Sequence, residues 1–227
     1  MRPLARLLGA VLDGLLPRAC AGCAAGVDAE RVLCDACERS VRAIADTQEL
    51  HGRLRPLDAV VTAAWLEPPV NGWLHAFKYP ARGIAGLAPG PLAAMRELGR
   101  RAALRAPGPA PPLVVPVPLH PRRLRARGFN PALAVARAAA QAIGARVDPT
   151  ALERVRDTPT QTGLAAAARR ANLRGAMRAR RALPACVWIA DDVVTTGATA
   201  SEAARALRAA GARRVVAVAA ACTPLGR

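Results

Sequence analysis

Aromatic residues and lysine are scarce in this sequence, and no apolar run is long. Its 227 residues contain three tryptophans, one tyrosine and two phenylalanines, so Ala, Leu and Val must supply most of the core. No apolar run approaches the ~20 residues that a membrane-spanning helix requires, which argues against such a span. Lys78 is the only lysine among 33 basic residues. A single lysine among so many arginines is a candidate for a chemical role.

The composition is that of a globular protein with a strongly basic surface. The chain is 52% apolar and 22% charged, which suits one α/β domain of ordinary size with a small appendage. The formal net charge of +17 attracts polyanions, either nucleic acid or phosphorylated metabolites, in a salt-dependent way. Charge alone does not choose between them. Because Ala and Arg are also enriched by a GC-rich coding background, an arginine by itself does not mark a functional site.

The first residues, MRPLARLLGAVLDGLLPRAC, have the early arginine and apolar stretch of a signal peptide. Asp13 interrupts that stretch, however, and the leucines recur at helical spacing. We therefore expect an amphipathic docking helix and a cytoplasmic chain. In that compartment the cysteines are not expected to form disulfides.

Four of the six cysteines form one array of two CxxC pairs separated by ten residues: Cys20, Cys23, Cys34 and Cys37. Two such pairs place four thiolates at the corners of a tetrahedron, the geometry that Zn²⁺ prefers. A redox dithiol and a disulfide staple are the alternatives, and both explain two pairs less well than a structural zinc does. Cys186 and Cys222 lie in apolar, strand-like runs and are expected to be ordinary buried thiols.

The remaining pattern alternates between strands and helices, with no visible repeat. We expect strands at 58–66, 113–119, 185–190 and 213–222, and helices through Trp73 and Phe77 and at 84–105, 131–144 and 198–211. Residues 106–112 read as a rigid Pro-rich connection, 120–130 as a loop, and 151–182 as irregular and then helical. This order predicts an α/β fold with a parallel sheet and helices on both faces.

The stretch IADDVVTTGAT at 189–199 places Asp191 and Asp192 after an apolar strand. Ligands of an open parallel sheet bind beyond the carboxyl ends of its strands. Here the next residues turn into a helix, so their N–H groups converge at the positive end of the helix dipole, where phosphates bind. The residues of this loop are Thr195, Thr196, Gly197, Ala198 and Thr199. A phosphate at the loop and a diol at the acids describe a ribose 5-phosphate, whereas in the plainer alternative the acids only cap a turn.

This stretch resembles the phosphoribosyl diphosphate signature of the type I phosphoribosyltransferases. Together with the four-cysteine array, FKYPARG (77–83), the VVPVPLHPRRLRARGFN-containing stretch at 114–138 and TPTQTGLAAAARRANLRGA (158–176), it resembles the ComF family. These are competence-associated, phosphoribosyltransferase-like proteins that include the GntX type. The resemblance extends from about residue 15 to 222.

The resemblance implies a division into an N-terminal helix and zinc knuckle (1–45) and a phosphoribosyltransferase-like domain (46–227), with a hood at 58–110 and a core at 113–227. It implies that the loop after the first core strand binds pyrophosphate, through His120, Arg122 and Arg127. For most arginines of that loop, a solvated surface position is the alternative. The lid and hood residues that it implies are Lys78, Tyr79, Gln161, Arg169 and Asn172.

The implied chemistry is displacement of pyrophosphate at C1 of a ribose, with Mg²⁺ on the pyrophosphate and Asp191 and Asp192 on the ribose. The sequence names no acceptor. Family membership also implies a role in DNA uptake during natural transformation, with a DNA-uptake helicase and other competence proteins as partners. The alternatives are a non-catalytic, single-stranded DNA-binding accessory protein and, less favoured, a nucleobase salvage enzyme.

Overall fold

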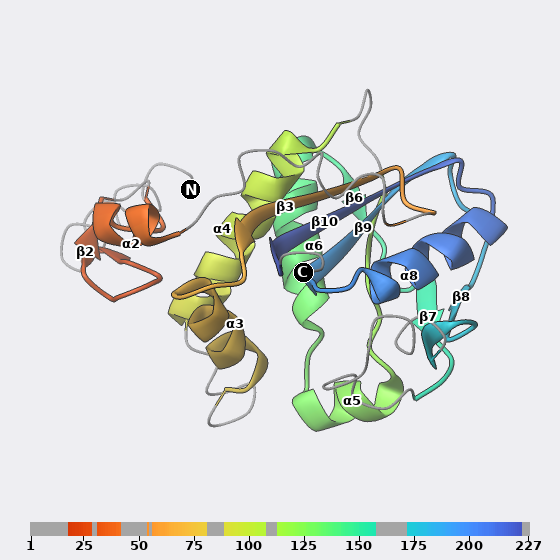
Figure 1. The fold of residues 1–227 in the computed structure, drawn as a ribbon, viewed down its shortest axis with the longest axis horizontal. Coiled ribbons are helices and arrows are strands. Elements are labelled where there is room, and N and C mark those ends of the chain that lie inside the picture. The colour runs from red at the N-terminus through yellow and green to blue at the C-terminus, as the bar shows by residue number, and fades with distance from the viewer. Residues whose placement is uncertain are drawn as a thin grey trace, which may run out of the picture.

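The computed structural model describes residues 18–28, 31–41, 54, 56–80, 89–107, 113–157 and 172–223. Its centre is a five-stranded parallel sheet with the strand order β3-β10-β9-β5-β6 (Figure 1). The strands are β3 (Ala59–Trp65), β5 (Leu113–Pro116), β6 (Arg146–Val147), β9 (Cys186–Val194) and β10 (Arg214–Cys222). The predicted α/β class is confirmed. None of the described helices has the length and apolar character to cross a bilayer.

Helices cover both faces of this sheet. They are α3 (Val70–Lys78), α4 (Pro89–Arg105) and α6 (Pro131–Ile143) on one face and α8 (Ala198–Ala209) on the other. Side chains of a strand alternate between faces, and β10 shows this directly. Val216 and Val218 pack into the cluster of α3, α4 and α6, whereas Val215 and Ala217 pack with α8. Both faces are therefore apolar, as a covered parallel sheet requires.

The outer edge of β5 is only partly covered. β6 pairs with Leu113 and Val114 and then ends. Beyond that point, Val117 donates its N–H to Ala190 of β9 (2.8 Å), so by alternation Pro116 and Pro118 face the open edge. Proline has no N–H to leave unpaired, which is why it is tolerated at sheet edges. The sequence VPVPL (115–119) thus leaves the open edge of the sheet without main-chain N–H donors at Pro116 and Pro118.

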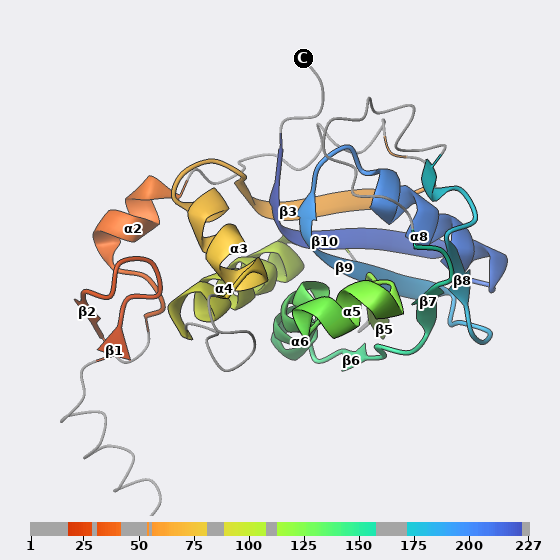
Figure 2. The same ribbon diagram turned by 90° about the horizontal axis from the view of Figure 1, so that it is seen from below.

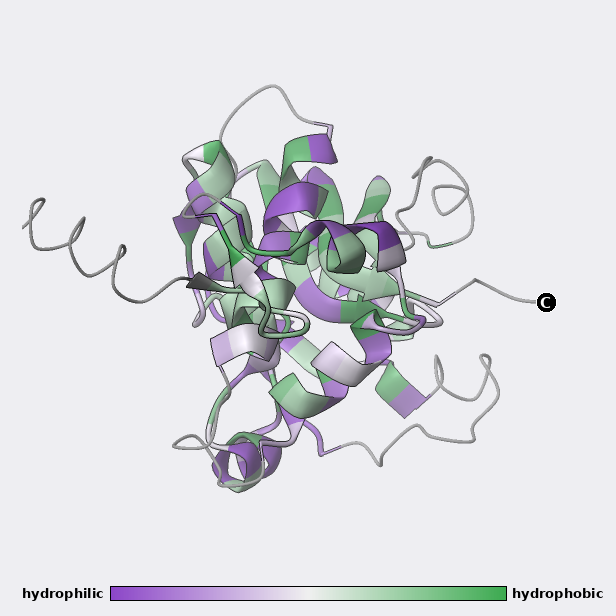
Figure 3. Ribbon diagram, turned by 90° about the vertical axis from the view of Figure 1, so that its left-hand side faces the viewer, coloured by the Kyte–Doolittle hydropathy of each residue, from purple (hydrophilic) through white to green (hydrophobic). Residues whose placement is uncertain are grey.

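The stretch 120–130, predicted to be a loop, contains a helix, α5 (Pro121–Arg127). His120 caps it by accepting the N–H of Arg122, Pro121 occupies the first turn, and Gly128 ends it with a φ of 84°. Pro121 and Gly128 are ordinary start and stop signals, whereas histidine is not a preferred N-cap residue, and the dense arginines obscured the helix. Figure 3 shows α5, the lowest helix in that view, as mostly hydrophilic.

Two further expectations about secondary structure are wrong. The strand predicted to end at residue 190 continues as β9 to Val194, so both acids belong to the strand. The stretch 151–182, expected to be irregular and then helical, is helical only at 172–173 among its described residues, and it otherwise supplies the antiparallel pair β7 (Leu152–Arg154) and β8 (Met177–Ala179). The buried carboxylate of Glu202 on α8 accepts the N–H of Met177 (3.4 Å), and this tertiary contact holds β8 extended.

The other elements agree with prediction within a few residues: β3, α3, α6, α8 and β10. β6 was not predicted. The expected N-terminal helix, residues 84–88 of the helix that becomes α4, and most of the Pro-rich connection lie outside the described residues. Cys222 is buried as expected, while Cys186 is half-buried.

The cysteine-bearing segment forms a small unit at one end of the molecule, beside α3 and α4 (Figure 2). It consists of β1 (Arg18–Ala19), β2 (Gly26–Val27) and α2 (Asp35–Ser40). A side chain at Gly22 would meet the Trp73 ring at 2.5 Å, so this glycine allows the unit to pack on α3. The unit also contacts α4: both terminal nitrogens of Arg101 donate to the carboxylate of Glu38 on α2, at 2.5 and 2.8 Å.

Candidate functional site

The four cysteines predicted to bind zinc converge. Their sulfur atoms all lie within 4.8 Å of one another, and the Sγ atoms of Cys23 and Cys34 are 3.6 Å apart. Tetrahedral coordination with Zn–S bonds of about 2.3 Å separates the sulfurs by about 3.8 Å. The cluster could therefore hold a zinc ion, with all four positions filled by protein.

Backbone amides prepare this cluster for a cation. The Sγ atom of Cys20 accepts N–H groups from Gly22 (3.3 Å) and Cys34 (3.2 Å). Burial opposes ionisation of the thiol, but hydrogen bonds from the amides of Cys34, Cys23 and Gly22 lower the pKa of Cys20 to about 6. Burial and the neighbouring thiols raise the pKa of Cys37. A metal ion would remove this conflict by binding all four as thiolates.

Asp191 and Asp192 lie in the part of β9 that is paired with β10 but extends beyond the end of β5. On one side, Asp191 is still paired in register with Ala219 of β10. On the other side the register with β5 ends at Pro116 and Ala190, so the acids extend just past the end of that strand. This is the carboxyl edge at which ligands of parallel sheets bind.

Lys78 reaches this acid pair from the end of α3. It is the last residue of α3, and its Nζ lies 2.9 Å from Oδ2 of Asp192. The side chains of Lys78 and Asp192 are only 20% and 9% exposed, so the ion pair is largely shielded from water. The only lysine in the chain therefore contacts one of the two predicted ribose ligands.

The two carboxyl groups share one crowded site. Asp191 Oδ1 accepts the N–H of Asp192 at 2.9 Å. Burial, followed by repulsion from Asp192, raises the pKa of Asp191 well above its usual range, and Lys78 acts in the opposite direction. Such a strained charge arrangement is typical of ligand sites. A ligand that donates hydrogen bonds here, such as a vicinal diol, would relieve it.

The loop after the acids forms the N-terminus of α8. Gly197 is the N-cap with a φ of 71°, and it has no side chain that could cap the helix. A side chain at this position would meet Leu54 at 2.5 Å, so both backbone conformation and packing require glycine. No described residue hydrogen-bonds to the hydroxyls of Thr195, Thr196 or Thr199. First-turn amides and hydroxyls thus lie together at the positive end of the helix.

Two of the predicted pyrophosphate residues, His120 at the N-cap of α5 and Arg122 within it, face an acid that the sequence did not reveal. Asp157 has carboxylate oxygens 3.7 Å from His120 Nδ1, 3.7 Å from Arg122 Nη1 and 3.6 Å from Arg123 Nε. Three cationic or protonatable groups therefore converge on one anion at distances slightly longer than close ion pairs. An arrangement that surrounds one carboxylate in this way can also surround a phosphate.

Arg127 and Tyr79 connect α5 to the C-terminal end of α3. The guanidinium carbon of Arg127 lies 5.0 Å from the centroid of the Tyr79 ring, within the range of a cation–π contact. Just inside, the rings of Phe77 and Phe129 are 5.3 Å apart. Tyr79 is 60% exposed, so its ring still has surface available to a ligand.

Sequence reasoning missed Asp157 and also Arg154 of β7. Arg154 is buried, and burial, followed by the nearby charge of Arg123, lowers its pKa, while Asp191 and Asp157 oppose that change. The charge of buried Arg154 therefore interacts with Asp191 on β9 and with Asp157, which faces α5. The one signal for Arg154 in the sequence was its alternation with Leu152, which puts an arginine on the same, buried face of the strand as the leucine.

Of the predicted lid residues, Asn172 lies at the edge of the described part and accepts a hydrogen bond from Arg156 through its carbonyl oxygen (2.9 Å). Gln161 and Arg169 lie outside the described residues. The structure thus brings together Lys78, the acid pair and the α8 loop, and it places Tyr79 beside the cations of α5.

Comparison with known proteins identifies relatives over most of the chain. DNA utilization protein YhgH of Salmonella typhi is 35% identical over 162 residues, 70% of each chain. The YhgH protein of Escherichia coli K12 is 34% identical over the same length. Competence protein F of Haemophilus influenzae is 33% identical over 109 residues, 46% of this chain and 48% of its own length. No protein-family model matches. These similarities, which agree with the motifs at both ends of the chain, show that the protein belongs to the ComF family.

Proposed function

We propose that this protein binds phosphoribosyl diphosphate together with Mg²⁺ and that it acts in DNA uptake. The second part rests on its relatives, which are named for DNA utilization and competence. The first part rests on one observation: an acid pair, a helix N-terminus without a side-chain cap and a cluster of cations lie around the carboxyl ends of β5 and β9. A DNA-uptake helicase and other competence proteins are the candidate partners.

Each part of the ligand has a chemical counterpart in this site. The 5-phosphate would accept hydrogen bonds from the amides of 195–199. The ribose hydroxyls would donate to Asp191 and Asp192, and the diphosphate would replace Asp157 among the cations of α5. Lys78, which neutralises Asp192 in the absence of ligand, would be available to the diphosphate once the diol occupies the acids.

The residues present fit Mg²⁺ only as a companion of the diphosphate. Among the described residues, the cysteines form the only group of three or more metal-binding side chains, so no protein cage for Mg²⁺ exists there. Carboxylate oxygens are suitable hard ligands, and Asp191 and Asp192 would supply them. When bound, Mg²⁺ neutralises charge on the leaving diphosphate.

The corresponding reaction is a pentosyl transfer to an acceptor that is not identified. The bond from C1 of the ribose to the diphosphate oxygen breaks, and the diphosphate leaves with the electron pair. A lone pair of the acceptor forms the new bond to C1, and the acceptor loses its proton to water. The acid pair would stabilise positive charge on the sugar ring, and the cations of α5 would stabilise the leaving group.

Calorimetric titration with phosphoribosyl diphosphate and Mg²⁺ tests the proposal. We expect saturable heat from the native chain, and none from the variant Asp191→Asn with Asp192→Asn. Asp28→Asn, an exposed acid of the cysteine unit, is the matched control and should bind normally. Absence of heat from the native chain, or equal binding by the double variant, would contradict the assignment of the ribose to the acids.

A second candidate function is direct binding of single-stranded DNA. It is favoured by the net charge of +17 and by the high exposure of Arg122 on α5 (81%) and Arg178 on β8 (73%). Binding of a labelled oligonucleotide, measured at two salt concentrations, should weaken with salt and should survive Asp191→Asn with Asp192→Asn. If that double variant lost DNA as well as the sugar phosphate, both ligands would share one site.

A further inference from the structure

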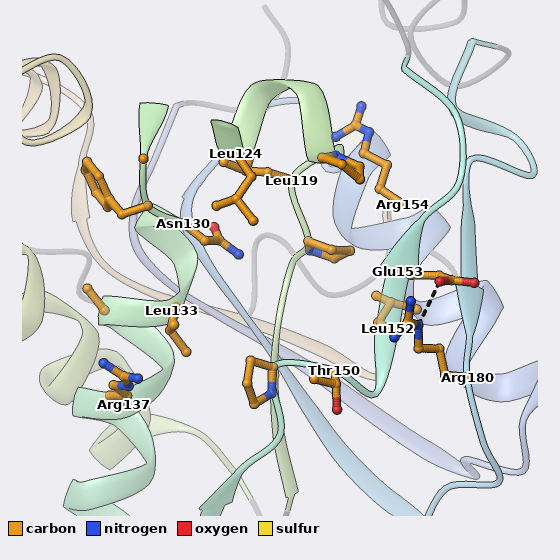
Figure 4. Close-up of a pocket in the computed structure, with 16 residues that line it drawn as sticks. Leu119, Leu124, Asn130, Leu133, Arg137, Thr150, Leu152, Glu153, Arg154 and Arg180 are labelled. Carbon is orange, nitrogen blue, oxygen red and sulfur yellow. Dashed lines mark hydrogen bonds and ion pairs between the residues drawn. The ribbon is translucent and has the colours of Figure 1, made fainter. Parts of the chain in front are cut away.

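A cavity of about 600 Å³ lies beside the open edge of β5. Figure 4 shows it between α6 on one side and β7 and β8 on the other, with α5 above. Neither the acid pair, the loop 195–199, Arg122 nor Arg127 lines it. Helix α5 instead turns Pro121 and Leu124 toward it. The cavity therefore lies outside the residues assigned to phosphoribosyl diphosphate, although Arg154, which is close to both Asp191 and Asp157, borders both sites.

Its walls are apolar and largely flat. Pro118, Pro121, Pro149 and Phe129 contribute ring surfaces. Leu124, which also lines the cavity, is 42% exposed, so part of its side chain is accessible. The volume falls within the roughly 300–1,000 Å³ of small-molecule sites. Such surfaces suit a planar ring.

The charged groups around the cavity are mostly cationic. Arg137, Arg154 and Arg180 line it, and Glu153 is the only acid that does so. Glu153 is already held by Arg180 Nε (2.7 Å) and by Arg178 Nη2 (2.6 Å). Arg137 is exposed, and no acid of the described part of the chain pairs with it. The cavity thus has a surplus of guanidinium groups.

Main-chain and amide groups offer little to a neutral polar ligand or to a peptide strand. Pro116 and Pro118 have no N–H, so a strand could not pair along this edge. The side chain of Asn130 is satisfied, because it donates to Val117 O (2.9 Å) and accepts from Ala132 N (3.1 Å). The guanidinium groups are therefore the principal donors, and their planar fork binds pairs of oxygen atoms on carboxylates or phosphates.

We propose that this cavity is a second ligand site, which binds a planar organic anion: the ring lies against the prolines and Phe129, and the acidic group lies against Arg137. The proposal does not depend on the binding of phosphoribosyl diphosphate.

Two fluorescent probes that share a ring system test it: 8-anilinonaphthalene-1-sulfonate, an aromatic anion, and N-phenyl-1-naphthylamine, its neutral analogue. The native chain should bind the sulfonate saturably. Arg137→Gln should weaken that binding about tenfold, the value of one charge-assisted contact, and should leave the neutral probe unchanged. Arg146→Gln, an exposed arginine outside the lining, is the control and should have no effect.

Filling the cavity provides the second arm. Ala134 lines it from α6, and Ala134→Leu or Ala134→Trp should reduce binding of both probes, with thermal unfolding monitored to confirm an intact fold. Equal sulfonate binding by the native chain, Arg137→Gln and Ala134→Trp would refute the proposal. So would displacement of the sulfonate by phosphoribosyl diphosphate with Mg²⁺ in competition, because the cavity would then belong to the first site.

Discussion

The ion pair between Lys78 and Asp192 gives the sharpest test of how the end of α3 is held against β9. We expect Lys78→Met to destabilise the ligand-free protein, because it leaves the carboxylate of Asp192 largely buried beside Asp191 with no cation in contact. The methionine side chain keeps the length and the apolar packing of the lysine stem. The change therefore removes charge with little change in shape.

The magnitude follows from the geometry. At the observed 2.9 Å, the attraction is about 6 kcal/mol for an effective dielectric constant of about 20. Desolvation of both groups offsets much of this, and breaking a buried pair typically costs about 3–5 kcal/mol. Because the Lys78 side chain retains 20% exposure, we expect the lower end, about 3 kcal/mol. With a urea m-value of about 2 kcal/mol/M, the midpoint should fall by about 1.5 M.

Urea unfolding at pH 8 with saturating zinc measures this change, and a double-mutant cycle isolates the pair. Lys78→Met should have little effect once Asp192→Asn is present. Arg31→Met removes one side of the exposed pair with Asp35 and should leave the midpoint unchanged. The reasoning is refuted if Lys78→Met costs the same with and without the Asp192 carboxylate, since the loss would then be one of packing.

Three further outcomes follow from the same structure. Burial and repulsion raise the pKa of Asp191, so folding is favoured while this carboxyl is protonated, and that contribution is lost as pH rises through its native pKa. Asp191→Asn should therefore be more stable than the native chain at pH 8, and its free energy of unfolding should depend less on pH between pH 5 and 8. In Gly22→Ala the new Cβ would lie 2.5 Å from the Trp73 ring, so the ring must move. We expect a loss of about 1–3 kcal/mol in the free energy of unfolding and a shift in tryptophan fluorescence. Gly197→Ala should cost about 2 kcal/mol, from its φ of 71° and the Leu54 contact, measured by thermal unfolding.

Matched glycines serve as controls for the last two. A side chain at Gly26 meets nothing within 4 Å, so Gly26→Ala should leave the fluorescence unchanged. Gly144 has a φ of 66° and open space, so Gly144→Ala reports the backbone cost alone. If Gly197→Ala cost no more than Gly144→Ala, the contact with Leu54 would be unimportant. A steeper fall of stability with pH in Asp191→Asn would invert the assumed direction of its pKa.

The fold was predictable where local pattern and burial agree. Strand β10 and helix α8 follow from an apolar run and from an apolar stripe that ends at glycine. Helix α5 was missed because its arginines suggested a solvated loop and its N-cap is a histidine, which is not a preferred N-cap residue, although Pro121 and Gly128 are ordinary helix-start and helix-end residues. The end of β9 was misplaced because aspartate is rare in strands, and here pairing with β10 overrides that preference.

The site was predictable only in parts. The acid pair and the threonine loop are contiguous in sequence, so their proximity could be inferred. The contact of Lys78 with Asp192, and the convergence of α5 on Asp157, join segments separated by more than thirty residues. Such contacts depend on how α3 and α5 pack, and no local pattern records that. The scarcity of lysine was the one compositional clue to Lys78.

Among the described strands, only β10 pairs with β3 in the sheet. During synthesis, residues 59–65 therefore find their strand partner only after about 150 further residues have been made. A ribosome-bound or C-terminally clipped chain could assemble β5, β6 and β9 yet leave the acids uncovered. Completion of the ligand site is thereby tied to the synthesis of β10.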